Sequence, residues 1–247
     1  MLDKYINNIK DKLRENAPTF SQDEILRRYR ILNSTNPNFR SYGLKMAVIE
    51  NIVKQVHGKY DCSYDEAVKV FNKLISSDIH DENFAAILFL NRFKKFFDES
   101  TLKLIFDKFS LYCDTWALCD STMIKIVGPF LGKKGNEKLA ENTIERWSNS
   151  DNMWIRRASM VILLKLTMMR KDFNEILVFN LVDKMLSYPE EYIQKGIGWL
   201  LKTCSSYKPD VIIKYLNKNK KRLTRLILRY ATEKLPEDIR AEILKKV

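Results

Sequence analysis

Three short stretches of the sequence place an aromatic ring and an ionisable group on one face of a helix. Trp116 and Asp120 are four residues apart, and Trp154 and Arg157 are three apart. Residues at these spacings are neighbours on a helix surface. A third stretch puts an indole between two amines, at Lys195, Trp199 and Lys202. The sequence therefore offers carboxylate, indole and cation chemistry.

Asp120 has an unusual setting for a solvated charge. Apolar residues flank it at Cys119, Met123, Ile124 and Val127. Two interpretations are open: the carboxylate acts on a bound substrate, or it ties two helices together. Trp147 has no charged neighbour on its helix face and is predicted to lie in the core.

Several familiar active sites lack their signatures. The sequence has no GxGxxG, GxxxxGK[ST], GxSxG, HExxH or HxE…PCxxC, which argues against dinucleotide, P-loop, serine-hydrolase, zinc-peptidase and zinc-deaminase chemistry. The cysteines Cys62, Cys113, Cys119 and Cys204 form no CxxC pair, and His57 and His80 are the two histidines. We therefore expect no metal and no cofactor, and we predict that the cysteines are small core residues in a reducing compartment.

The chain is strongly basic, with 43 Lys plus Arg against 31 Asp plus Glu and a formal net charge of +12. An excess of this size favours a polyanionic partner such as nucleic acid; the alternative is a merely basic, soluble surface. Near the carboxyl end, cations recur at i, i+4, i+7 and i+11, at Lys218, Arg222, Arg225 and Arg229. We predict that they form a row on one helix, where they repel one another unless a polyanion neutralises them.

Apolar residues recur at helical spacing through most of the chain. Helices are predicted over 63–76, 84–97, 102–111, 116–131, 139–147, 153–168, 176–186, 193–201 and 223–235. The seven glycines and six prolines are fewer than the roughly seventeen and twelve of average usage, so turns are short. Helix pairs recur about every 35 to 45 residues, which is typical of helical repeats. We predict an all-α fold, a superhelical solenoid of antiparallel helix pairs (HEAT-like or armadillo-like), as a single domain over 1–247.

No stretch approaches the roughly 20 apolar residues that cross a bilayer, and the amino-terminal residues lack the apolar core of a signal peptide. We expect a cytoplasmic protein, located at the nucleoid in a bacterium or archaeon and in the nucleus of a eukaryote. Gly196 and Gly198 lie inside a predicted helix, where each costs about 1 kcal/mol relative to alanine. Close helix packing and close approach by a ligand backbone explain them equally well.

At these residues the sequence resembles the DNA alkylation repair family of HEAT-like repeat DNA glycosylases. The resemblance rests on Trp116-x-x-x-Asp120, on Trp147-x-x-Ser150-Asp151-Asn152-x-Trp154-x-x-Arg157, and on 193–201 followed by Pro209-Asp210-Val211. It covers most of the chain from about Tyr29 onward. It implies a basic concave face that grips duplex DNA, and hydrolysis of the N-glycosidic bond of cationic N3- and N7-alkylated purines, such as 3-methyladenine and 7-methylguanine, without base flipping.

The resemblance also implies functions for single residues. Asp120 matches the catalytic aspartate, Trp116 and Trp199 match two indoles that line the deoxyribose of the lesion, and Arg157 matches an arginine that contacts DNA. The chain departs from the family at Lys202, where the family usually has arginine; lysine keeps the charge but loses the bidentate fork. The frequent Thr-Pro-x-x-Arg after the Tyr-Gly-like turn is also missing, since Lys45 follows Tyr42-Gly43-Leu44.

Physical chemistry agrees with this assignment. A base alkylated at N3 or N7 already carries positive charge, so it leaves as a neutral molecule and needs no general acid. Asp120 would stabilise the cation that develops on the sugar, by about 3 to 4 kcal/mol in a partly dry site, and the indoles of Trp116 and Trp199 would attract it. Phosphate contacts are predicted for Arg156, Arg157, Lys195, Lys202, Arg222 and Arg225.

The predicted partner is double-stranded DNA with alkylated bases, bound by a monomer. The alternative function is a non-catalytic helical-repeat module that binds nucleic acid or protein, in which Asp120 only joins two helices.

Overall fold

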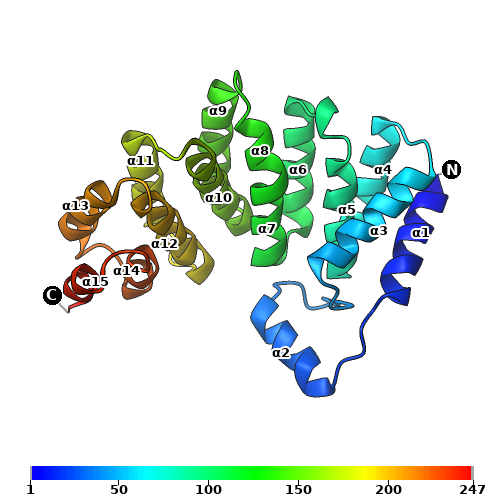
Figure 1. Cartoon of the computed structure of the whole chain (residues 1–247), viewed down its shortest axis with the longest axis horizontal. Coiled ribbons are helices and arrows are strands. Elements are labelled where there is room, and N and C mark those ends of the chain that lie inside the picture. The colour runs from blue at the N-terminus through cyan, green and yellow to red at the C-terminus, as the bar shows by residue number, and fades with distance from the viewer. Residues whose placement is uncertain (1, 246–247) are drawn as a thin grey trace. The chain divides into compact units, whose positions relative to one another are not determined.

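Helices make up the regular structure of this protein, for which a computed structural model describes residues 2–245 (Figure 1). Within those residues no β-strand forms, and one isolated β-bridge joins Arg40 to Ile79. The all-α prediction is confirmed. The chain folds as two compact units, Met1–Thr122 and Met123–Val247; that 1–247 forms a single domain stays a prediction. No helix among residues 2–245 is both long enough and apolar enough to cross a membrane.

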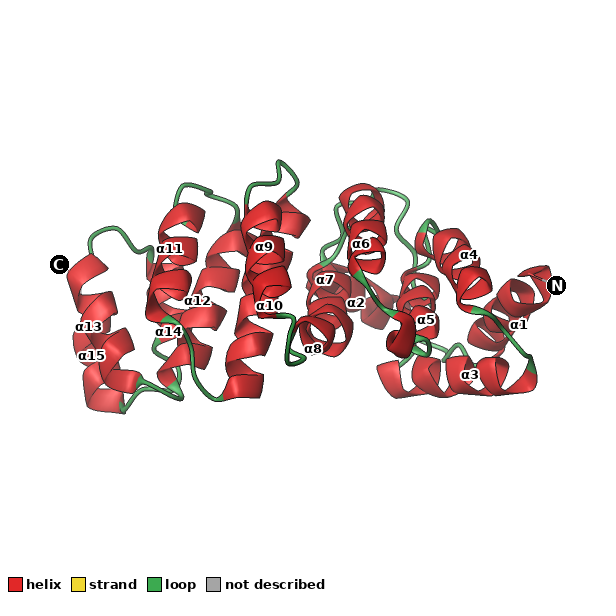
Figure 2. Ribbon diagram, turned by 90° about the horizontal axis from the view of Figure 1, so that it is seen from above, coloured by secondary structure: helices red, strands yellow, loops and turns green. Residues whose placement is uncertain are grey.

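The first unit alternates its helices between two layers (Figure 2). α3, α5 and α7 contact one another in series, α4 packs along α5 and contacts α6, and α1 contacts α3, α4 and α5. This alternation is the packing of a helical-repeat fold. The elements are α1 (Leu2–Glu15), α2 (Gln22–Leu32), α3 (Met46–Lys59), α4 (Tyr64–Ile75), α5 (His80–Asn91), the 3-10 turn η1 (Lys94–Phe96), α6 (Glu99–Tyr112) and α7 (Trp116–Thr122).

Side-chain caps fix where several of these helices begin. The Ser63 hydroxyl accepts from the Glu66 N–H, and the Glu66 carboxylate accepts from the Ser63 N–H at 3.0 Å. Asp98 and Thr101 form the same reciprocal arrangement at the start of α6. Such capping boxes satisfy N–H groups that have no partner inside the helix. They explain why α4 starts where the predicted helix over 63–76 starts.

α2 lies below the ends of the other first-unit helices in Figure 1, and none of its residues is fully buried. The loop that follows it anchors it to the turn before α7. There the Ser34 hydroxyl donates to the Asp114 carboxylate at 2.6 Å, and the Thr35 N–H donates to the Asp114 carbonyl at 2.9 Å. The carboxyl end of α2 is thereby positioned beside the start of α7.

The second unit repeats the two-layer pattern. α8, α10, α12 and α14 contact one another in series, while α9, α11 and α13 pack against that series. The elements are the π-helix η2 (Met123–Val127), α8 (Gly128–Leu131), α9 (Glu137–Ser148), α10 (Met153–Arg170), α11 (Glu175–Met185), α12 (Glu191–Ser205), α13 (Pro209–Asn219), α14 (Arg225–Ala231) and α15 (Glu237–Leu244).

α10 is the central helix of the second unit. Every side chain from Trp154 to Leu164 is buried, including Arg156 and Arg157, which are 4% and 5% exposed. Asn152 caps the helix and accepts from the Trp154 N–H at 2.8 Å. Because a buried charge is costly unless it is paired and hydrogen-bonded, the arginines must find partners inside the protein.

The predicted row of cations from Lys218 to Arg229 on one helix is wrong. α13 ends at Asn219 and α14 begins at Arg225. A new helix starts there because the Thr224 side chain caps it, accepting from the Ile227 N–H at 3.3 Å. The helix predicted over 223–235 is correspondingly shorter. Arg222 therefore lies in the turn between α13 and α14 and does not continue the helix face that carries Arg225.

Candidate active site

Trp116 and Asp120 lie one turn apart on α7, as their spacing predicts. Trp116 is half-buried, and its indole N–H donates to the Ile31 carbonyl at the end of α2 at 3.0 Å. Asp120 is 7% exposed, and its neighbours Leu118 and Cys119 are fully buried. One short helix thus carries an indole restrained by a hydrogen bond and a carboxylate that is largely removed from water, where its charge acts more strongly.

Asp114 is a second buried carboxyl group near α7 and is not among the predicted site residues. Burial raises the pKa of this carboxyl, and the hydrogen bond from Ser34 lowers it in part. The available signal was an aspartate in the turn directly before a helix, a position where this residue often bonds nearby backbone. Asp114 holds the end of α2 and so supports the hydrogen bond that restrains Trp116.

Arg157 and Trp154 of α10 both meet Tyr192 of α12. Arg157 donates to the Tyr192 carbonyl, and its guanidinium lies 6.0 Å from the tyrosine ring centroid. The Trp154 and Tyr192 rings lie 5.0 Å apart. Tyr192 is not among the predicted site residues, although it stands three residues before Lys195 on the same helix face. It joins the amino-terminal ends of α10 and α12.

Arg156 has several of its donors engaged by protein groups. It donates to the carbonyls of Ser150 at 2.9 Å and Asp151 at 2.8 Å, pairs with Glu190 at 2.5 Å, and lies 4.0 Å over the Tyr188 ring. The sequence analysis names Arg156 as a DNA contact, and the structure buries its side chain within α10. That Arg156 contacts DNA stays a prediction.

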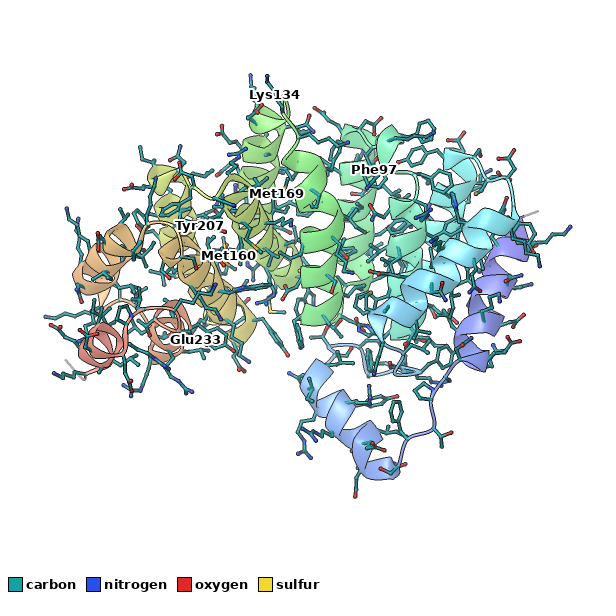
Figure 3. The ribbon with its side chains drawn as sticks, viewed as in Figure 1. Phe97, Lys134, Met160, Met169, Tyr207 and Glu233 are labelled. Carbon is teal, nitrogen blue, oxygen red and sulfur yellow. The ribbon has the colours of Figure 1, made fainter. Side chains whose placement is uncertain are left out.

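The indole and the two amines predicted to share a helix face all lie on α12. Trp199 is half-buried. Lys195 pairs with Glu191 at 2.6 Å, and this hydrogen bond raises the pKa of the amine. Lys202 pairs with Glu233, which is labelled in Figure 3. A phosphate that bound either lysine would compete with a carboxylate.

Arg222 and Arg225 are exposed, as expected of phosphate contacts. Arg222 lies 3.3 Å from the Asp183 carboxylate, and Arg225 donates to the Leu244 carbonyl at 3.0 Å. Both guanidiniums keep surface toward solvent, unlike those of Arg156 and Arg157.

The two glycines of α12 differ in how closely other helices approach them. A Cβ on Gly198 would lie 2.4 Å from the Cβ of Tyr230 and 3.1 Å from the Ile227 carbonyl oxygen, on α14. A Cβ on Gly196 would lie 2.7 Å from the terminal methyl of Met160, labelled on α10 in Figure 3. Of the two explanations, close packing is confirmed for Gly198; for Gly196, which faces the end of a flexible methionine side chain, it stays a prediction.

Among residues 2–245, no three or more His, Cys, Asp or Glu side chains gather in a way that could hold a metal ion. Cys113, Cys119 and Cys204 are buried, which confirms the prediction that they are core residues, whereas Cys62 is partly exposed. Trp147 is fully buried in the core, as predicted.

Comparison with known proteins identifies the family of this chain. Residues 9–235 match the family described as DNA alkylation repair enzyme. The fold is similar to that of a predicted DNA alkylation repair enzyme from Enterococcus faecalis, with a TM-score of 0.74 and 16% identity over 90% of this chain and 100% of that one. It is also similar to AlkD2 from Streptococcus mutans, with a TM-score of 0.56 and 17% identity over 86% of this chain and 98% of that one. No curated protein matches. The chain belongs to the DNA alkylation repair enzyme family.

Proposed function

We propose that this protein is an alkylpurine DNA glycosylase, a hydrolase that cleaves the N-glycosidic bond of N3- and N7-alkylated purines in duplex DNA without base flipping. Family membership supports a DNA repair enzyme. The observation that carries the finer proposal is the pairing on α7 of a 7% exposed carboxylate, Asp120, with the indole of Trp116 one turn away.

The chemistry of the lesion suits this small set of groups. A purine alkylated at N3 or N7 carries a positive charge that it loses when the glycosidic bond breaks, so the leaving base needs no proton. Positive charge develops instead on the deoxyribose. An enzyme for this reaction needs an anion near the sugar, and it needs no pocket to recognise or protonate the departing base.

Asp120 would supply that anion. Its carboxylate would stabilise the oxocarbenium-like transition state and orient the attacking water. Preorganised groups of this kind contribute about 3 to 4 kcal/mol, or roughly a factor of 10² to 10³ in rate. The π-faces of Trp116 and Trp199 would attract the sugar more strongly as it becomes cationic, which is the differential binding that catalysis requires.

The phosphates would be bound by Arg157, Lys202 and the exposed Arg222 and Arg225, with Lys195 and Arg156 as further candidates. Such contacts position the duplex and carry no sequence information. This suits an enzyme that must act on damage in any sequence. Lys202 would bind as a point charge, since lysine lacks the planar fork of arginine.

The test is release of free base from methylated duplex DNA. The purified protein is incubated with DNA that contains 7-methylguanine and 3-methyladenine, and the released bases are separated by chromatography. Asp120→Asn should abolish release while DNA affinity stays the same or rises, because the variant loses a negative charge. Asp107→Asn, at an exposed position of α6, is the control: it removes the same charge, has no assigned part in the chemistry, and should leave release unchanged.

Two outcomes would contradict the proposal. If Asp120→Asn released 7-methylguanine at the rate of the natural protein, Asp120 would have no part in the reaction. If the natural protein bound duplex DNA and released no base, the catalytic function itself would be wrong.

The second result would favour the alternative function, a non-catalytic module that binds nucleic acid or protein. The burial of Asp120 and the pairing of Lys195 and Lys202 with carboxylates speak for that alternative, since both are features of a structural network. It predicts salt-dependent duplex binding and a loss of stability, with no change in chemistry, when Asp120 is replaced.

A further inference from the structure

A cavity of about 460 Å³ lies in the first unit between α2, the loop that follows it, and the helices α3 and α5. Its walls are mostly apolar and include the rings of Phe20, Tyr29 and Phe84 and the side chain of Ile49. Binding sites for small molecules have about this volume and this character, with a few polar groups on an apolar wall. All of its lining residues belong to the first unit.

The buried imidazole of His80 lines this wall. His80 is 5% exposed, and neither ring nitrogen forms a hydrogen bond with any group among residues 2–245. The ring is held by Phe39 and Phe84, whose centroids lie 5.3 and 4.6 Å away. A buried polar group without a partner is costly, so a ring fixed in this way points to a ligand that completes its hydrogen bonds.

The charge state of His80 limits what that ligand can be. Burial lowers the pKa of the imidazole to about 4, against a smaller raising effect of the neighbouring Asp81. At neutral pH the ring is therefore uncharged and offers one N–H donor and one nitrogen acceptor. An anion would gain no opposite charge from it, and a purely apolar ligand would leave both nitrogens unsatisfied.

The carboxyl group of the cavity wall next to His80 is already engaged. The Asp81 carboxylate accepts from the Ser41 hydroxyl at 2.8 Å and from the N–H groups of Tyr42 and Leu44 at 2.7 and 2.9 Å. These bonds shape the wall and leave the carboxylate little capacity for a ligand. Gly43, with a φ of 75°, completes this wall, since a Cβ there would meet the Phe20 ring at 2.4 Å.

We propose that this cavity binds a planar, uncharged heteroaromatic ring of purine size, which stacks on the aromatic wall and exchanges hydrogen bonds with His80. The ring can come from a free base or from a nucleotide. Arg28, exposed and 3.9 Å above the Phe20 ring, would meet the phosphate of a nucleotide. The proposal concerns a site in the first unit and does not depend on glycosylase activity.

The experiment uses adenine and adenosine 5′-monophosphate as probes on the full chain labelled with ¹⁵N-histidine. The two histidines give two sets of imidazole signals. Adenine should shift the His80 set and leave the His57 set in place. Calorimetry should show that His80→Phe, which keeps an aromatic ring between Phe39 and Phe84, weakens adenine binding at least tenfold, while the matched control His57→Phe does not.

A second variant guards against a folding defect in His80→Phe. Ile25 lines the cavity from the half-buried face of α2, so Ile25→Trp should fill the space and abolish binding while the His80 signals remain those of a folded protein. Tighter binding of the monophosphate that is lost in Arg28→Gln would identify a nucleotide as the source of the ring, and equal or weaker binding would identify a free base. Absence of any His80 shift up to the solubility limit of adenine, or unchanged binding to His80→Phe, would overturn the proposal.

Discussion

Buried and solvent-exposed cations of this protein differ in how much free energy it costs to separate them from their partners. Arg156 is almost fully buried and bonds to Glu190 and two carbonyls. Removing one partner of a buried pair leaves an uncompensated charge. Lys202 keeps contact with solvent, where an ion pair such as the one with Glu233 contributes only about 0 to 1 kcal/mol. A phosphate can therefore displace the partner of Lys202 far more easily than the partners of Arg156.

Trp116 serves both the fold and the proposed reaction, and a conservative substitution separates the two. Trp116→Phe keeps an aromatic face but removes the donor to the Ile31 carbonyl. We expect a loss of about 1 kcal/mol of stability, felt mainly as faster amide hydrogen exchange in the last turn of α2, together with slower base release. Trp199→Phe should slow base release without changing exchange in α2. Equal exchange in both variants would show that the Trp116 hydrogen bond does not restrain α2.

His80 makes the stability of the fold sensitive to acid. Its pKa is about 4 in the folded protein, because burial disfavours the charged ring, against an ordinary value of 6.5 in the unfolded chain. As the pH falls from 6.5 toward 4, the unfolded chain takes up a proton that the folded protein does not, so the free energy of unfolding falls. From these values the loss between pH 7 and pH 4.5 is about 2 kcal/mol.

Urea unfolding at those two pH values checks this prediction. His80→Phe should lose less stability than the natural protein on acidification, because it lacks the buried imidazole. The carboxyl groups contribute equally to the pH dependence of both proteins. An identical loss in the two proteins would mean that His80 is protonated in the folded state.

Whether a helix could be predicted from the sequence depends on whether core packing or local caps and loop contacts stabilise it. The helices predicted over 63–76 and 153–168 match α4 and α10 closely, since their apolar periodicity reflects packing in a core. α2 was not among the predicted helices; it buries no residue fully and depends on its cap and on the loop bonded to Asp114. The break before α14 was missed because the charge spacing continues across the capping residue Thr224.

The features of the candidate site also differ in whether they could be predicted from the sequence. That Trp116 and Asp120 share a helix face follows from their spacing, and the structure agrees. The pairing of Trp116 with Ile31 in the first unit, and that of Arg157 with Tyr192 in the second, could not be predicted, because tertiary packing joins residues that are distant in the sequence. Spacing along a helix predicts neighbours on that helix only.

The α12–α14 contact gives a prediction about a glycine. Gly198→Ala should lower the free energy of unfolding by about 1 to 3 kcal/mol, because the added methyl would meet the Tyr230 Cβ and the Ile227 carbonyl, although alanine favours a helix by about 1 kcal/mol. Gly58→Ala is the matched control: nothing lies within 4 Å of its Cβ position, so stability should rise. Urea unfolding measures both, and a rise for Gly198→Ala would contradict the packing explanation.

At the scale of the whole molecule, the net charge of +12 sets long-range attraction to DNA, but it does not identify the cations that touch phosphates. Several candidates are already paired with carboxylates, as Lys195 is with Glu191 and Arg222 with Asp183. Removing any lysine lowers the overall charge equally. Only a residue that releases a counterion from a phosphate changes the salt dependence of binding, so this dependence can identify contacts that net charge conceals.

Lys202 offers the most direct test, because the resemblance noted in its sequence implies arginine at this position and because Glu233 competes for the amine. If Lys202 binds a phosphate, Lys202→Gln should reduce the slope of log K against log salt for duplex binding by about 0.9. Glu233→Gln should raise affinity, since the amine no longer has to leave a carboxylate. Lys134→Gln, at an exposed turn between α8 and α9 labelled in Figure 3, removes the same charge as a control. Equal slopes for Lys202→Gln and the natural protein would show that the Lys202–Glu233 pair stays closed when DNA binds.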